Sequence, residues 1–446
     1  MAVRVRAPGD PTAGPHDTGR RRVRALAGRA FWNAADQMVS SATNLALSLL
    51  VARALPTEGF GDFAVAFTIY VFLTSAGRSL VAQPLVVRHA AATPEEFRAA
   101  AGSATGVTAL LGIVAGLVTA GAGLLLGGAI SLPLLTMGAL LPGLLVQDMW
   151  RAVFSTQGRP FAAFVNDVVW AVLQFAAVAA VLVLDRDSAT AMLLAWGGPA
   201  LVAAVIGAVQ FGARPRLRAG VAWLARQRDL LGYYAAQFAS VMGANQVTLL
   251  LIAAVGSTSD VGALRAAQVV LGPLTLLNLS ALTFVLPEIS RRRLTGRRAI
   301  EVAVMASLGM LVLTLAWGAV AVALPDSIGT ALLGDTWASA EPVIPATLVG
   351  MIGIAVGFGA MIVLMGRGYA KDVFWVCALL APGFLVLGLG GLHLWGATGA
   401  ALGLSLAQWV IVPVAWWRVA VLMRRERDHL PAPEAPGPPG TSGRQV

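Results

Sequence analysis

The chain has 446 residues, of which 57% are hydrophobic and only 12% are charged. A soluble domain carries about 25% charged residues, so this composition argues against a soluble protein and indicates a large lipid-facing surface. The formal net charge of +10 comes almost entirely from arginines at the ends of apolar runs, which argues against the basic face of a nucleic-acid-binding domain.

Twelve apolar runs are long enough to cross a membrane as helices, because a hydrocarbon core of about 30 Å requires about 20 residues. Several contain glycine or proline, which membrane helices tolerate because neighbouring helices satisfy the freed backbone groups. We therefore predict an all-α integral membrane protein. In chain order the predicted spans cover 30–52, 60–86, 99–126, 129–150, 161–184, 189–211, 231–254, 263–288, 299–324, 342–365, 373–394 and 397–420.

Positive charge alternates between the connectors of these spans. Every second connector is rich in arginine, whereas the connectors between them carry little positive charge. Because arginine and lysine are retained on the cytoplasmic side, we predict that both termini are cytoplasmic in a multi-pass protein of the cell (plasma) membrane. The predicted inner segments are 20–24, 88–98, 151–159, 214–228, 291–298, 367–371 and 424–425.

A long basic connector divides the chain into six spans plus six. Its apolar residues fall on one side, which indicates a helix lying at the surface of the anionic cytoplasmic leaflet. The predicted organisation has a disordered basic cytoplasmic tail, an N-terminal six-helix lobe, an interfacial linker helix, a C-terminal six-helix lobe and a second disordered cytoplasmic tail. These parts cover residues 1–28, 29–212, 213–230, 231–422 and 423–446.

The two halves contain matching residues at a constant separation of 201 positions. Since each half has an even number of spans, both share one orientation, and the pseudo-twofold axis runs along the membrane normal. Two such lobes around a central cavity form the layout of an alternating-access carrier; the alternative is an old duplication retained only for packing. The matching pairs are Asn44 and Asn245, Thr57 and Thr258, and Gly61 and Gly262.

Several short motifs suggest a family. They are Phe31-Trp32-Asn33, the polar run from Asp36 to Ser41, Ala52-Arg53-Ala54-Leu55, Glu58-Gly59-Phe60-Gly61, the joint 151–159 followed by Asn166, Asp167 and Trp170, and Gly334 with Trp337. The membrane region resembles polysaccharide repeat-unit (O-antigen-type) flippases of the multidrug/oligosaccharidyl-lipid/polysaccharide exporter superfamily. The resemblance implies a two-lobed bundle that rocks between inward-open and outward-open states while moving a lipid-linked saccharide. Lipid II flippases of this superfamily carry two further helices that this sequence lacks.

Arg78 is the most deeply placed arginine within a predicted span. It lies ten residues before Arg88, at the inner end of the span, which corresponds to about 15 Å of helix. Snorkelling does not easily cover that depth, so we predict that Arg78 faces the central cavity and holds a pyrophosphate in bidentate fashion. The alternative is an internal ion pair with Asp36 or Asp148.

Other polar residues within the spans are further candidates for the cavity. Arg53 and Arg265 lie near the outer ends of their helices, where snorkelling to the outer headgroups accounts for each of them; the alternative is that both line the outer mouth. Asn44 and Asn245, placed equivalently in the two lobes, are candidates for binding sugar hydroxyls. Amide side chains can also simply join membrane helices. The remaining candidates for the cavity are Gln83 and Gln268.

Asp36, in the inner third of the first span, is a candidate for coupling transport to a proton or sodium gradient. The alternative is a structural ion pair with an arginine. The sequence contains no phosphate-binding loop of the Gly-x-x-x-x-Gly-Lys-Ser/Thr type, its four histidines lack metal-ligand spacing, and no nucleophile accompanies a base. We therefore expect no catalytic residues, no metal and no cofactor.

The predicted function is flipping of a polyprenyl-pyrophosphate-linked oligosaccharide from the inner to the outer leaflet, for cell-surface polysaccharide assembly. The lipid tail stays in the bilayer, so a lateral gap opens between helices one and eight. Membrane lipids and a glycosyltransferase or polymerase of the same pathway are the expected partners. One alternative is a cation-coupled multidrug exporter of the same superfamily, which Arg78 disfavours. Another is a membrane polysaccharide polymerase or ligase, which usually has a large outer loop, whereas the longest one here is 325–341.

Overall fold

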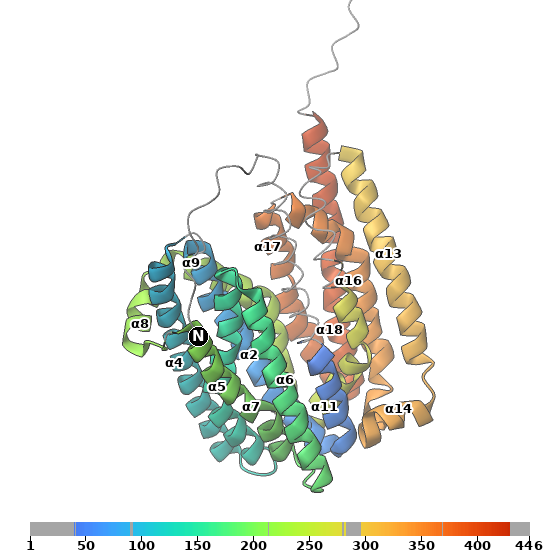
Figure 1. The fold of residues 1–446 in the computed structure, drawn as a ribbon. Coiled ribbons are helices and arrows are strands. Elements are labelled where there is room, and N and C mark those ends of the chain that lie inside the picture. Colours follow the sequence, from blue (N-terminus) through green and yellow to red (C-terminus); the bar gives the residue numbers. More distant parts are fainter. Residues whose placement is uncertain are drawn as a thin grey trace, which may run out of the picture.

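A computed structural model describes residues 40, 42–89, 92–212, 214–278, 281, 296–367 and 369–428. Within these ranges the chain forms helices joined by short connections, and no strand occurs (Figure 1). Eight of the described helices are long and apolar enough to cross a membrane, or nine if a bent pair counts as one span. The prediction of an all-α, multi-pass membrane protein is confirmed.

The N-terminal lobe is built around α5, which packs against α4 and α7 and contacts α2 and α6. The first helix of the lobe covers 42–54 and precedes α2. Its last turn leads through Pro56 into α2, which continues without a break into the π-helical segment η1 and then α3. The helices are α2 (Thr57–Gly77), η1 (Arg78–Ala82), α3 (Gln83–His89), α4 (Pro94–Leu126), α5 (Ser131–Thr156), α6 (Pro160–Val183) and α7 (Ala189–Phe211).

The linker between the lobes contains α8 (Leu217–Ala225), which packs against α4. The backbone N–H of Arg216 donates to the carbonyl of Gly102 at 2.8 Å, and the side chain of Trp223 is buried. Leu217 and Val221 remain exposed. The apolar residues that the sequence places on one side of this helix are therefore shared between contact with α4 and the outer surface.

The C-terminal lobe has α16 at its centre, in contact with α11, α13 and α18. Trp395 and Gly396 interrupt α18, and Gly396 has φ +58°, which glycine adopts without strain. The predicted spans 373–394 and 397–420 lie on the two sides of this break. The elements are α9 (Arg228–Phe238), η2 (Ala239–Gly243), α10 (Ala244–Val255), α11 (Thr258–Val270), a helix over 272–278, α13 (Gly296–Val322), α14 (Asp326–Leu333), η3 (Gly334–Thr336), α15 (Trp337–Ala340), α16 (Val343–Gly366), α17 (Ala370–Ala378) and α18 (Leu380–Asp428).

The end of α18 differs from the prediction for the C-terminal tail. The helix continues to Asp428, so residues 423–428 are helical rather than part of a disordered tail. Arginine and glutamate have high helix propensity, and the positive charge of Arg424 and Arg425 is favourable near the end of a helix. The predicted tail 1–28 lies outside the described residues, as does the first part of the span 30–52.

The outer surface of the helices is apolar. Leu125 of α4 is 90% exposed, and large apolar side chains on α7, α13 and α18 are also exposed. A water-soluble protein does not expose so many large apolar side chains. Contact of these side chains with lipid tails accounts for the low charge content of the chain.

The two lobes meet where α2 packs against α11. Gly61 and Gly262 face each other there: a β-carbon on Gly262 would lie 3.0 Å from the α-carbon of Gly61, and one on Gly61 would overlap the carbonyl of Thr258. The backbones approach this closely because both residues lack a side chain. Two residues that match in the sequence repeat therefore meet at the lobe interface.

Candidate functional site

A hollow of about 400 Å³ lies between the lobes. The helix over 42–54 and α2 form its N-terminal wall, while α11 and the helix over 272–278 form its C-terminal wall. Besides apolar side chains, its lining contains two arginines together with hydroxyl and amide groups. These polar residues are Asn44, Ser48, Tyr70, Thr74, Ser75, Arg78, Arg265, Gln268 and Thr275.

Arg78 opens the π-helical segment η1, which interrupts the regular turn of the second span. Insertions of this kind often occur at functional sites, because they change the direction in which the following side chains point. The Nε atom of Arg78 donates to Oδ2 of Asp148 at 2.9 Å, and Nη2 donates to Oδ1 at 2.5 Å. The Asp148 side chain is only 9% exposed, whereas that of Arg78 is 53% exposed. Arg78 is thus paired on one side and open to the hollow on the other.

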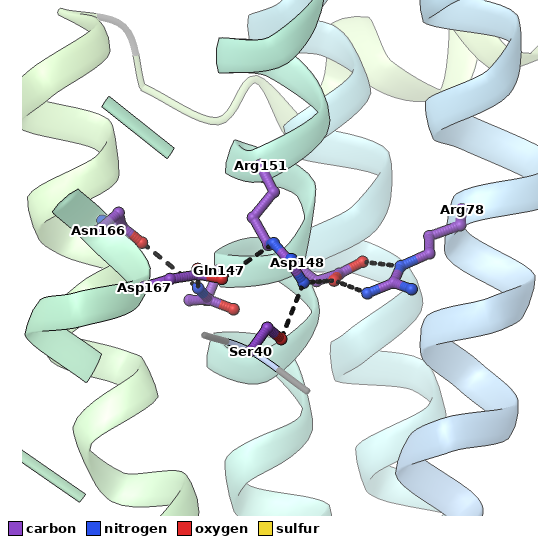
Figure 2. A network of polar contacts seen from close by, with 7 residues as sticks. All are labelled: Ser40, Arg78, Gln147, Asp148, Arg151, Asn166 and Asp167. Atoms are coloured by element: carbon purple, nitrogen blue, oxygen red, sulfur yellow. Dashed lines mark hydrogen bonds and ion pairs between the residues drawn. The ribbon is translucent and has the colours of Figure 1, made fainter. Parts of the chain in front are cut away.

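A network of polar side chains from α5 and α6 surrounds Asp148, the carboxylate of this pair (Figure 2). Nη1 of Arg151 lies 3.9 Å from Oδ1 of Asp148, and its Nε lies 3.0 Å from Oδ2 of Asp167. The amide of Gln147 donates to Oδ1 of Asp167 at 2.8 Å. Two guanidinium groups therefore alternate with two carboxylates, so the charge of Arg78 is compensated.

Arg265 lies on the opposite wall and has a different environment. Its Nη2 donates to the hydroxyl of Thr68 on α2 at 3.0 Å and to the amide oxygen of Gln246 at 3.2 Å, and its Nη1 donates to Gln268 at 3.2 Å. Its Nε is buried without a hydrogen-bond partner. Among the residues that the structure describes, no carboxylate forms an ion pair with Arg265.

Among the described residues, only neutral oxygens and the ring of Phe67 surround this positive charge, with the ring centre 5.9 Å from the guanidinium carbon. An uncompensated charge away from water is costly, and an anion beside it removes that cost. Arg265 does not snorkel to the outer surface, because its side chain lines the hollow and reaches across to α2. The hollow therefore favours an anionic ligand.

Aromatic rings from α2 form a ladder along the same hollow. Phe60, Phe63, Phe67 and Tyr70 follow one another at centroid separations of 6.4, 5.9 and 5.6 Å, and Trp196 of α7 lies 4.9 Å from Tyr70. The spacing of three or four residues places these rings on one face of the helix. Sequence reasoning did not single out this face, although the spacing of its rings is readable in the sequence.

The predicted site residues lie in the hollow between the lobes, in a second hollow, or outside both. Asn44, Arg78, Arg265 and Gln268 line the hollow between the lobes. Asn245 instead lines a second hollow within the C-terminal lobe, so the two equivalent asparagines do not share one cavity.

The other predicted residues lie elsewhere. Arg53 is exposed near the end of its helix, where its carbonyl packs against Gly334, and Gln83 is partly buried beside neither hollow. Asp36, the candidate for coupling, lies outside the described residues. Within the described ranges, no three histidine, cysteine or carboxylate side chains gather as metal ligands would.

No family model and no curated protein matches the sequence. The fold, however, is similar to that of solved membrane transporters. A structure of the lipid II flippase MurJ in an inward closed conformation has a TM-score of 0.69 at 12% identity, covering 86% of each chain. An inward-facing multidrug resistance MATE family transporter of the MOP superfamily has a TM-score of 0.63 at 13% identity, covering 87% of this chain and 95% of that one. An outward-facing MATE family transporter has a TM-score of 0.53 at 14% identity, covering 90% and 96%.

Proposed function

We propose that the chain is an alternating-access transporter that flips a polyprenyl-pyrophosphate-linked oligosaccharide from the inner to the outer leaflet. The observation that carries this proposal is the charge of Arg265, which no described carboxylate compensates, in a hollow between two lobes. A pyrophosphate group supplies the missing negative charge, and guanidinium groups bind phosphate oxygens through paired N–H donors. Asn44 and Ser48 offer hydrogen-bonding groups for sugar hydroxyls.

Binding of the anion also involves Arg78. Its guanidinium already donates to Asp148, so an incoming phosphate shares or replaces that carboxylate. A hollow of about 400 Å³ is within the range of about 300–1,000 Å³ that holds one small ligand. The pyrophosphate and the first sugar occupy it, while the rest of the saccharide extends toward the open end.

The two lobes contact each other toward both ends of the bundle. Residues 57–61 approach 258–262 at the predicted outer end, and Arg88 of α3 pairs with Asp229 of α9 at the predicted inner end. The TM-scores are 0.69 to the inward closed flippase, 0.63 to the inward-facing MATE transporter and 0.53 to the outward-facing one, which supports an inward state whose inner end is partly closed. A β-carbon on Gly272 would lie 2.9 Å from Leu45, so helices one and eight are in contact where the lateral gap has to open.

The proposal places the chain in the plasma membrane with both termini cytoplasmic. Its substrate comes from glycosyltransferases on the inner face and passes to a polymerase or transferase on the outer face. The chain itself forms and breaks no bond. A proton or sodium gradient, or consumption of the substrate outside, drives the net direction, because ligand binding alone shifts the two states only by its differential affinity.

Proteoliposomes loaded with a fluorescent polyprenyl-pyrophosphate sugar test the proposal. We expect the wild-type chain to expose the labelled head group to an outside quencher, and Arg265→Gln to abolish this exposure. Arg265→Gln removes the charge and keeps a hydrogen-bonding amide, and thermal unfolding checks that the variant is folded. Arg53→Gln, which removes an arginine outside the hollow, is the matched control and retains transport. Wild-type transport by Arg265→Gln refutes the proposal.

A second candidate function, multidrug export, is favoured by the aromatic ladder of α2, because aromatic rings bind flat apolar cations. The two arginines oppose it, since they repel a cationic cargo. Ethidium flux in the same vesicles distinguishes the candidates. Under our proposal ethidium does not cross faster than in empty vesicles, and Phe67→Ala leaves that background unchanged.

A further inference from the structure

A second hollow, of about 650 Å³, lies inside the C-terminal lobe. It is surrounded by η2, α10, α11, α16, α18 and the helix over 272–278. It is larger than the hollow between the lobes, and the function proposed above makes no use of it.

The wall of this second hollow is adapted to an apolar occupant of variable shape. Among the residues that the structure describes, no charged side chain lines it, which argues against a free anion or a metal ion. Four methionines do line it, and methionine is flexible enough to pack against irregular apolar groups. Glycines on one face of α16 leave the helix backbone uncovered there. These residues are Met242, Met351, Met361 and Met365, with Gly350, Gly353 and Gly357.

The few polar groups of the wall include two that belong to both hollows. Gln268 and Thr275 line this hollow and the hollow between the lobes. The side-chain oxygen of Gln268 accepts a hydrogen bond from Arg265 at 3.2 Å. One ligand can therefore place a negative group at Arg265 and pass an apolar segment over Gln268 into the C-terminal lobe.

We propose that the second hollow binds the isoprenoid segment next to the pyrophosphate of the substrate. This inference rests on the proposed function and adds a requirement to it: the tail is held by the protein near the head group and enters the bilayer only beyond that point. Binding of the apolar segment fills the empty volume and gains the contacts that its lining lacks without a ligand. A free pyrophosphate or a nucleotide sugar leaves the second hollow empty and binds less tightly.

Gly357→Leu tests this proposal by filling the second hollow. A β-carbon on Gly357 meets only Val412, at 3.6 Å, so the longer side chain extends into the empty space without overlapping the backbone. Gly357→Ala controls for the change of helix propensity. Gly309→Leu adds the same side chain to α13, where a β-carbon meets nothing within 4 Å.

The measurement is calorimetric binding of farnesyl pyrophosphate and of inorganic pyrophosphate to the full chain in nanodiscs. We expect the wild-type protein and both controls to bind farnesyl pyrophosphate at least tenfold more tightly than pyrophosphate. In Gly357→Leu we expect the affinities for farnesyl pyrophosphate and for pyrophosphate to differ by less than about twofold, with the affinity for pyrophosphate unchanged. Unchanged preference for farnesyl pyrophosphate in Gly357→Leu, or no preference in the wild type, overturns the proposal.

Arg265→Gln separates this proposal from the one on which it rests. If Arg265→Gln abolishes pyrophosphate binding while Gly357→Leu has no effect, only the proposal about the tail fails. If Arg265→Gln binds pyrophosphate as the wild type does, the function itself is wrong. Photolabelling of the wild type with a diazirine analogue of farnesyl pyrophosphate is independent of how any variant folds. We expect label on α16 and α18 near Met361 and Gln408; label confined to the N-terminal lobe contradicts the proposal.

Discussion

Asp148 competes with the proposed anionic ligand for Arg78, and Asp148→Asn measures this competition. The substitution keeps the shape of the side chain and removes its charge. Arg78 donates two hydrogen bonds to the carboxylate, at 2.9 and 2.5 Å, and hydrogen bonds to charged groups contribute about 1.5–3 kcal/mol each. Because 53% of the Arg78 side chain is exposed, we take the lower end of that range for the pair.

A release of about 1.5 kcal/mol corresponds to an affinity about tenfold higher, since about 1.4 kcal/mol changes a binding constant tenfold. Asp148→Asn is therefore expected to bind inorganic pyrophosphate about tenfold more tightly than the wild type. The same change lowers stability, because Arg78 then loses the carboxylate that it pairs with and Arg151 loses a neighbouring negative charge. Removing one partner of a buried pair costs about 3–5 kcal/mol, and the exposure of Arg78 reduces the expected loss to about 1–3 kcal/mol.

Isothermal titration of the purified chain with pyrophosphate, together with thermal unfolding, checks both effects. Asp187→Asn, which neutralises an exposed carboxylate in the connection between α6 and α7, is the control and changes neither quantity. The double variant Arg78→Gln/Asp148→Asn should lose the gain in affinity, because the released guanidinium is absent. Equal or weaker binding by Asp148→Asn refutes the reasoning that the carboxylate and the ligand compete.

Two further predictions concern the scaffold. Gly262→Leu forces α11 away from Gly61 at the lobe contact, so we expect a lower melting temperature and loss of transport, whereas Gly390→Leu, where a β-carbon meets nothing within 4 Å, retains both. Trp150→Ala removes a fully buried ring whose indole N–H donates to the carbonyl of Ala204 at 2.9 Å; we expect a loss of about 3–5 kcal/mol in urea unfolding of the detergent-solubilised chain, with unchanged affinity for pyrophosphate below the unfolding transition.

The spans were predictable because the bilayer imposes a length and an apolar composition on every helix that crosses it. All twelve predicted spans contain helix in the described part of the chain, including the pair that α18 joins across Gly396. The pairing of Arg78 with Asp148 was also among the alternatives derived from the sequence. Depth along a helix and opposite charge were sufficient to suggest it.

The direction in which a membrane helix faces was not predictable in the same way. In a soluble helix, the polar face marks the side that points to water. In a membrane helix, the lipid-facing side and the packed side are both apolar, so the position of Arg265 along α11 indicated its depth and not its direction. The sequence therefore suggested contact with the outer headgroups, whereas the side chain faces the hollow.

The internal repeat also did not predict which residues line the hollow between the lobes. It relates Asn44 to Asn245 within their own lobes, and the packing of one lobe on the other is not part of the repeat. Asn44 comes to line the hollow between the lobes, while Asn245 faces the interior of the C-terminal lobe. Gly61 and Gly262 meet because they lie close to the axis that relates the lobes, where equivalent positions converge.

The two arginines of the hollow differ in how their charges are compensated. Arg78 comes from the N-terminal lobe with its charge compensated by Asp148, and Arg265 comes from the C-terminal lobe without a described counter-charge. An anion that bridges them attracts both walls, so its binding favours states in which the lobes are close around it. Under the proposed function, opening toward the other side requires α2 and α11 to separate at Gly61 and Gly262, where the helix backbones are in close contact. A ligand can drive that exchange only through contacts that differ between the two states, and the contact between Arg265 and Thr68 spans the boundary that must move.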